Sequence, residues 1–209
     1  VPQRIKETLG VNIKIIFILR NPAERAFSHH SMSLRQGFES KSFEEALNLE
    51  SNRLKGNIED QRYFSYSDRG FYGKQIKSFQ KIFKRENMHF IIFEEFVKNP
   101  EKVVKDVFLF LDLEHNLKIN YNIHTNKGYN YKYSILNSFL KNNKKYVDQL
   151  VKIIPPFLKH KISKFIGKKD IKNLKIKNRT KKMLLKKHFK DILLTEDLTG
   201  LNLEAWKQF

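Results

Sequence analysis

The chain has 209 residues, of which 40% are hydrophobic and 13% aromatic, so it is long and apolar enough for one domain with a core and is not a disordered chain. It contains no cysteine, which excludes disulfides and thiolate metal sites and favours a reducing compartment. No apolar run is long enough to span a bilayer, and no secretory signal opens the sequence.

The net charge of +19 is unevenly distributed. Residues 141–190 contain 18 Lys and Arg but only two acids, Asp148 and Asp170. A basic block of this kind can bind nucleic acid, acidic lipid or an anionic substrate, or it can be a solvated face. The composition leaves these alternatives open.

The first elements of the chain are predicted from short local signals. Residues 1–10 are expected to be the end of a helix that closes at Gly10. Ile15 to Leu19 is an unbroken, β-branched apolar run, which predicts a parallel strand buried on both faces. Pro22 suits the first turn of a helix that should run to about Gln36, with Asn21 as N-cap and Glu24 as the acid of a capping box.

This strand–turn–helix also predicts an anion site. Arg20 lies at the carboxyl end of the strand and beside a helix N-terminus, where anionic ligands bind in α/β proteins. Ser28 follows two turns along the helix, and its hydroxyl could reach the same phosphate. The alternative is an ordinary connection with a surface arginine.

Arg20, Asn21, Pro22 and Ser28 together resemble the 3′-phosphate-binding motif of sulfotransferases that use 3′-phosphoadenosine 5′-phosphosulfate (PAPS). In that family a strand ends in Arg-Asn-Pro, and a serine follows eight residues after the arginine. The resemblance implies an α/β, P-loop-NTPase-like three-layer fold with a central parallel sheet and a helix-rich C-terminal half. It also implies that Arg20 and Ser28 bind the 3′-phosphate.

Later segments resemble the same family in the same order. Ser42-Phe-Glu-Glu45 has the form of a capping box and predicts a helix to about Asn52, whereas residues 53–69 are polar and predict a loop near the site. Gly70, Tyr72, Gln75 and Ile76 match the family's next helix start, which would place Arg69 and Tyr72 at the cleft as acceptor-binding residues. A packed tyrosine at a helix start is the alternative.

The second half of the resemblance begins with a strand over residues 88–93. The acidic pair Glu94-Glu95 follows it, and Asn-Pro then leads into a helix over residues 101–113. A polar loop at residues 124–133 resembles the loop that closes over the nucleotide, which implies contacts from Lys127, Gly128 and Tyr131. Residues from Thr180 predict a helix whose apolar face carries Leu184, Leu185, Phe189, Ile192 and Leu193. The end of the chain resembles the family's closing Thr-Gly-x-x-Leu segment before Trp206.

One part of the family pattern is missing from the sequence. The resemblance implies a loop for the 5′-phosphosulfate that carries Lys followed by Gly-Thr or Ser-Gly-Thr, and no Lys-x-Gly-Thr occurs in these 209 residues. We therefore expect a single sulfotransferase domain over residues 1–209 that lacks its N-terminal 5′-phosphosulfate-binding segment. The catalytic base would be lost with that segment, and the fragment alone would be inactive.

These observations predict an enzyme that transfers a sulfuryl group from PAPS to a hydroxyl or amine of a carbohydrate, lipid or small molecule. A base would take the acceptor's proton, and no metal is required. Because lumenal sulfotransferases commonly carry a disulfide, the absence of cysteine favours a cytoplasmic, bacterial type. We expect no specific nucleic-acid partner and no transmembrane segment. The alternative function is a basic nucleic-acid-binding module built on residues 141–190, which carry no zinc-finger or RNA-binding signature.

Overall fold

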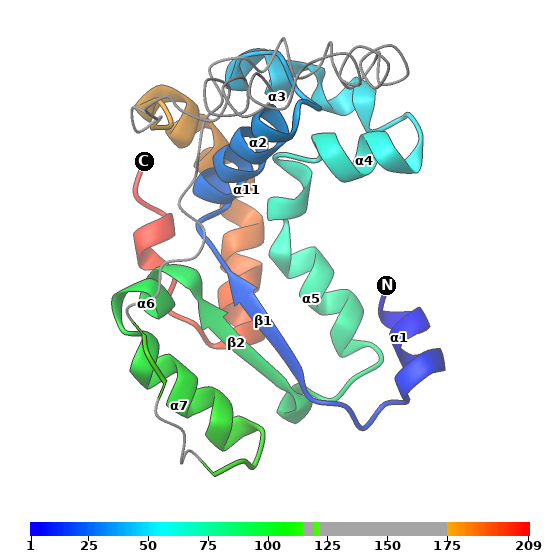
Figure 1. The fold of residues 1–209 in the computed structure, drawn as a ribbon, viewed down its shortest axis with the longest axis vertical. Helices are drawn as coiled ribbons and strands as arrows, with labels where there is room; N and C mark the ends of the chain where they lie inside the picture. The colour runs from blue at the N-terminus through cyan, green and yellow to red at the C-terminus, as the bar shows by residue number, and fades with distance from the viewer. Residues whose placement is uncertain (115–118, 122–174) are drawn as a thin grey trace, which may run out of the picture. The chain divides into compact units, whose positions relative to one another are not determined.

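The computed structural model describes residues 1–114, 119–121 and 175–209 (Figure 1). Contacts divide the chain into two compact units, which we describe separately: unit 1 is Val1–Arg25, Asp68–Thr125 and Asn178–Phe209, and unit 2 is Ala26–Ser67 and Asn126–Lys177. The elements are, in order, α1 (Pro2–Leu9), β1 (Ile15–Leu19), α2 (Pro22–Gln36), α3 (Phe43–Arg53), α4 (Ile58–Phe64), η1 (Asp68–Gly70), α5 (Tyr72–Gln80), η2 (Arg85–Asn87), β2 (Met88–Ile92), α6 (Phe93–Lys98), α7 (Pro100–Phe110), α11 (Asn178–Thr199) and η3 (Glu204–Trp206).

Unit 1 contains the predicted parallel strands. β1 and β2 pair in parallel, with Ile15 opposite Met88 and Leu19 opposite Ile92, so their carboxyl ends lie together. The two strands run side by side in Figure 1. The α/β class and the parallel pairing are therefore confirmed.

Helices lie on both faces of the strand pair. Phe17 of β1 contacts Phe90 of β2 and Phe79 of α5, with ring centroids 5.0 Å apart in each case. On the opposite face, His89 of β2 stacks on Phe110 of α7 at 5.1 Å. α11 packs along α5, beside it in Figure 1, so unit 1 has a helix–sheet–helix arrangement.

The expectation that β1 is buried on both faces is wrong. Ile16 is 38% exposed and Ile18 is 55% exposed, whereas Leu19 is 4% exposed. Because side chains alternate along a strand, these two isoleucines share the face on which α7 packs, and α7 packs there against β2. That face of β1 is therefore left exposed.

α11 joins α5 through a buried carboxylate. Asp191, 6% exposed, accepts hydrogen bonds from the N–H groups of Gly73 (2.8 Å) and Lys74 (3.1 Å). These donors belong to the first turn of α5, whose N-cap Phe71 offers no side-chain hydrogen bond. Gly73 permits the approach, since a Cβ there would lie 2.9 Å from Cγ of Leu194.

The predicted helix from Thr180 is confirmed as α11, but one residue of its predicted apolar face is misplaced. Leu184, Leu185 and Ile192 are each at most 2% exposed, whereas Leu193 is 42% exposed. At about 100° per residue, Leu184, Leu185 and Ile192 fall within one arc of the helix surface, and Leu193 lies outside that arc, towards solvent.

The loop expected at residues 53–69 is partly helical, because it contains α4. The side chain of Asn57 caps this helix by accepting from the N–H of Asp60 at 2.9 Å.

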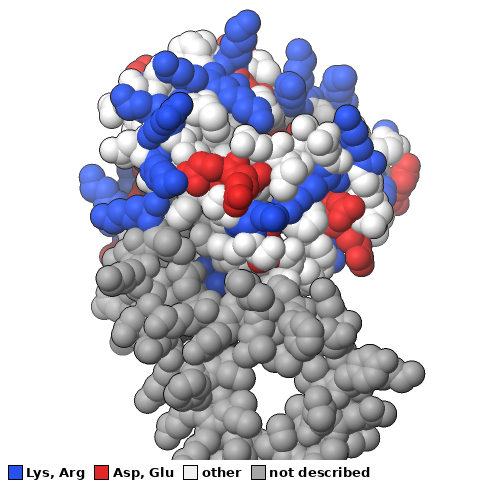
Figure 2. Space-filling view, turned by 90° about the horizontal axis from the view of Figure 1, so that it is seen from above, with Lys and Arg blue, Asp and Glu red and all other residues white. Residues whose placement is uncertain are grey.

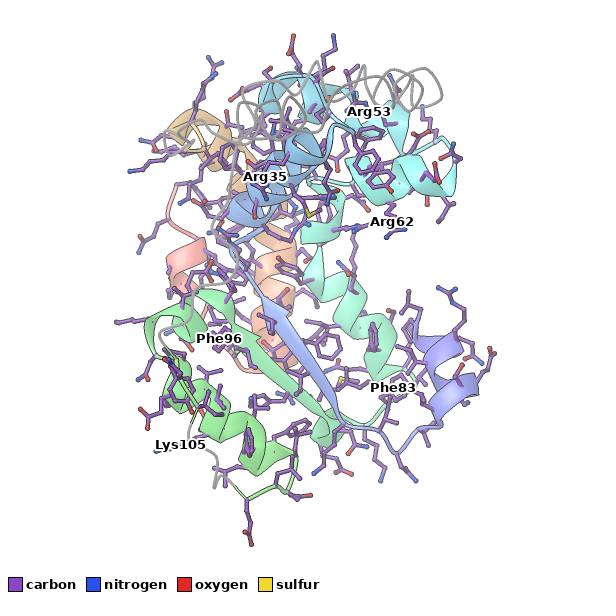
Figure 3. All side chains as sticks on the ribbon, viewed as in Figure 1. Arg35, Arg53, Arg62, Phe83, Phe96 and Lys105 are labelled. Carbon is purple, nitrogen blue, oxygen red and sulfur yellow. The ribbon has the colours of Figure 1, made fainter. Side chains whose placement is uncertain are left out.

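Unit 2 has a buried polar centre. Glu39, 1% exposed, is ion-paired with Arg53, whose position is labelled in Figure 3. The hydroxyl of Tyr66 donates to the same carboxylate at 3.0 Å. In contrast, the predicted capping box of α3 is present, with Ser42 and Glu45 bonding each other's backbone N–H.

Candidate active site at the carboxyl ends of β1 and β2

The peptide group between Arg20 and Asn21 is held on both sides by side chains. The hydroxyl of Tyr72, at the start of α5, donates to the carbonyl oxygen of Arg20 at 2.8 Å. The N–H of Asn21 donates to Oε1 of Glu94, which follows β2, at 2.9 Å. We call this group the Arg20–Asn21 peptide; its two contacts fix the backbone that carries the Arg20 side chain.

Asn21 is the N-cap of α2, as predicted, but Glu24 does not complete a capping box. The side-chain oxygen of Asn21 accepts from the N–H groups of Ala23 (3.1 Å) and Glu24 (3.2 Å). The backbone N–H of Asn21, which a capping-box acid would bind, is bound by Glu94 instead. Glu24 forms an ion pair with Lys181 of α11 at 2.7 Å.

Beside this peptide lies a pocket of about 550 Å³. The guanidinium of Arg20 lies 5.0 Å from the ring centroid of Phe93, over the aromatic face. The pocket is lined by the ends of both strands, by α6, by the start of α11 and by the last residues of the chain: Arg20, Asn21, Glu24, Ile92, Phe93, Glu94, Glu95, Val97, Lys181, Asn202, Ala205 and Trp206. Arg20 and Lys181 are the cations of this lining, and a guanidinium offers a planar fork of donors suited to phosphate.

Tyr72 is buried, at 8% exposure, and stays a hydrogen-bond donor over the usual pH range. Burial raises the pKa of its hydroxyl to about 12, against an ordinary value of 10.0. The nearby positive charge of Arg25 and the hydrogen bond to Arg20 act in the opposite direction and are weaker. The protonated hydroxyl therefore remains bonded to the Arg20–Asn21 peptide.

The other predicted site residues do not belong to the described lining of this pocket. Arg69 is exposed in η1, where its carbonyl oxygen accepts from the side chain of Gln75 at 3.1 Å. Ser28 is half-buried on α2, two turns after Pro22. Lys127, Gly128 and Tyr131 lie outside the described residues, so their contacts with a nucleotide stay predictions.

Two consecutive histidines of α2 are buried in unit 2. His30 is 3% exposed, and its Nε2 lies 3.0 Å from the carbonyl oxygen of Lys41. Burial lowers the pKa of His30, so its imidazole is held neutral. The rings of His29 and His30 lie 5.2 and 5.4 Å from that of Tyr66. Packing among aromatic rings is thus the observed role of both histidines.

Sequence reasoning missed Phe93, Lys181 and Trp206 as parts of the pocket. Phe93 follows β2 directly, so the rule that ligands bind at the carboxyl ends of parallel strands could have found it. Lys181 is 157 residues from its partner Glu24, and no local signal connects them.

A parallel strand pair covered by helices, with a pocket at the carboxyl ends of the strands, places the chain in the class of α/β proteins. Within that class, the chain belongs to the sulfotransferase domain family, whose sequence profile matches residues 3–172.

A solved relative has the same fold. The chain is similar to the crystal structure of a sulfotransferase from Alicyclobacillus acidocaldarius, with a TM-score of 0.66 and 23% sequence identity. The match covers 99% of this chain and 62% of the other, so the chain spans less than two thirds of that protein. No curated protein matches the chain. The P-loop-like sulfotransferase fold expected from the sequence is confirmed.

Two further findings concern the described residues only. No three His, Asp or Glu side chains in the described ranges come close enough together to hold a metal ion. Within the same ranges, every helix is too short or too polar to cross a bilayer.

Proposed function

We propose that the chain is part of a sulfotransferase that moves a sulfuryl group from PAPS to a hydroxyl or amine of a carbohydrate, lipid or small molecule. In this reaction the bond between sulfur and the leaving phosphate oxygen breaks, a bond from sulfur to the acceptor atom forms, and a base takes the acceptor's proton. Membership of the sulfotransferase domain family supports the reaction class.

The observation that carries the proposal is the fixed backbone at Arg20. A binding arginine must lose little freedom when it meets its ligand, and both sides of the Arg20–Asn21 peptide are already hydrogen-bonded. The Arg20 side chain lines the pocket at the strand ends, and we assign it to the 3′-phosphate of the donor. Ser28 would add a hydroxyl donor to the same phosphate.

The remaining roles in the proposal follow the family resemblance. Lys127, Gly128 and Tyr131 would close over the adenosine part of the donor, and Arg69 and Tyr72 would face the acceptor. Because no Lys-x-Gly-Thr occurs in the sequence, the 5′-phosphosulfate would be bound by a segment outside these 209 residues. A cytoplasmic location belongs to the same proposal.

The test is selective nucleotide binding, measured by calorimetry. Arg20→Ala should weaken the binding of adenosine 3′,5′-bisphosphate by about tenfold to a hundredfold, because a charged hydrogen bond contributes about 1.5–3 kcal/mol. The affinity for adenosine 5′-monophosphate, which lacks the 3′-phosphate, should fall far less. Arg4→Ala removes an exposed arginine of α1 and is the matched control. Equal losses for both nucleotides would show that Arg20 does not read the 3′-phosphate.

A further inference from the structure

Helix α11 has a basic face that is separate from the pocket. Its exposed cations are Arg179, Lys182, Lys186, Lys187 and Lys190. At about 100° per residue they occupy roughly 140° of the helix surface, opposite the buried Leu184, Leu185 and His188. Lys181, which lines the pocket, lies on the other side of the helix from Arg179.

Within the described residues, the acid that shares this face is the exposed Asp197, about two turns beyond Lys190. None of the five cations of the face has an ion pair in the described ranges, whereas Lys181 pairs with Glu24. Residues 122–190 contain 20 Lys and Arg but only Asp148 and Asp170 as acids. The next acid along the chain, Asp191, is buried and already binds the N–H groups of Gly73 and Lys74. On the face drawn in Figure 2, Lys and Arg side chains lie among fewer Asp and Glu side chains.

Apolar side chains lie within the same basic face. Met183, 51% exposed, lies between the cations, and Leu193, 42% exposed, lies on the same face nearly one turn beyond Lys190. A groove of about 590 Å³ opens on this face, with a described lining of Asn178, Arg179, Lys182, Met183 and Lys186. A partner must therefore be anionic and must also accept exposed methionine and leucine side chains.

We propose that this face of α11 binds the surface of an anionic lipid membrane. Lysine ammonium groups suit the diffuse negative charge of lipid headgroups, and four of the five cations are lysines. Met183 and Leu193 would enter the boundary between headgroups and acyl chains, as apolar side chains of interfacial helices do. A nucleic-acid backbone offers these two residues no apolar surface, so the face fits a membrane better than a duplex.

The experiment measures binding of the chain to phosphatidylcholine vesicles with and without phosphatidylserine. The triple variant Lys182→Gln, Lys186→Gln, Lys190→Gln should bind phosphatidylserine vesicles on the order of 100-fold more weakly, since each basic residue near the surface contributes roughly fivefold. The control triple Lys77→Gln, Lys81→Gln, Lys102→Gln removes the same charge from exposed positions on α5, the residue after it and α7. It should lose much less. Replacing the three α11 lysines by arginine should preserve binding.

A second variant separates a membrane from other polyanions. Met183→Ser keeps the charge; it should weaken vesicle binding severalfold and leave binding to duplex DNA unchanged. Equal losses for the two lysine triples would reduce the effect to net charge and overturn the proposal. So would equal binding to phosphatidylcholine alone, or tighter binding to DNA with no effect of Met183→Ser on vesicles.

Discussion

Removal of one hydroxyl, by Tyr72→Phe, tests whether the Arg20–Asn21 peptide is held as described. The ring remains, so its contact with Trp206, at 6.1 Å between centroids, is kept and no cavity forms. The variant loses the hydrogen bond of 2.8 Å to the carbonyl oxygen of Arg20. A buried hydrogen bond contributes about 1 kcal/mol, which for a chain of this size lowers Tm by about 2–4 °C.

The pH dependence of stability gives the same variant a second, independent readout. The pKa of Tyr72 is raised in the folded state to about 12 from 10.0. A raised pKa stabilises the fold below the unfolded value, and this contribution is lost as pH rises through the folded value. The stability advantage of wild type over Tyr72→Phe should therefore be constant below pH 10 and shrink between pH 10 and 12. Lysine titration affects both proteins alike and cancels in the difference.

Nucleotide binding connects this contact to the proposed function. If the Arg20–Asn21 peptide positions the Arg20 side chain, Tyr72→Phe should lower the affinity for adenosine 3′,5′-bisphosphate severalfold, measured by calorimetry. The affinity for adenosine 5′-monophosphate should fall less. Glu94→Gln, on the other side of the peptide, should act in the same direction, and the double variant should show a coupling of about 0.5 kcal/mol or more. Tyr63→Phe, which removes a hydroxyl in unit 2, is the control. Strictly additive effects together with unchanged nucleotide selectivity would refute the reasoning.

Two further predictions concern buried carboxylates. Asp191→Ala leaves the N–H groups of Gly73 and Lys74 unbound inside unit 1, which should cost about 1–3 kcal/mol and be seen as a lower Tm, while Asp191→Asn should restore part of it. For Glu39, burial opposes ionisation, but hydrogen bonds led by the one from Arg53 outweigh it and lower the pKa below 4.5. The ionised Glu39 should stabilise the fold above pH 4.5, and this contribution should be lost as pH falls further. Glu39→Gln should therefore flatten that part of a curve of unfolding free energy against pH. An unchanged slope would contradict the ion pair with Arg53.

Elements with local signals were predicted well from the sequence. The capping box at Ser42 set the start of α3, and the Asn21-Pro22 turn set the start of α2 at Pro22. Caps involve side chains only three residues from the backbone groups that they bind, so a short stretch of sequence contains the whole interaction. α4 was missed although Asn57 has the same capping contact, because its flanking residues are polar and lack helical periodicity.

Burial was predicted less well, because it depends on what packs against each face. The apolar run of β1 predicts two covered faces, yet coverage of Ile16 and Ile18 would require a helix to lie over that side of β1. α7 lies instead over β2. Leu193 of α11 was also predicted to be buried because it is apolar. Its position around the helix places it outside the buried arc that contains Ile192, so it is exposed.

The candidate site was predicted in part, and the reason lies in the sequence distance of its contacts. Arg20 could be identified from the strand–turn–helix around it. The groups that hold it come from 52 residues away for Tyr72 and 73 residues away for Glu94. Glu24 was the expected acid for the N–H of Asn21. The parallel pairing instead places the end of β2 beside the end of β1, and Glu94, which follows β2, accepts that hydrogen bond. Glu24 forms its ion pair with Lys181 instead, a residue near the start of α11 that is 157 positions away in the sequence.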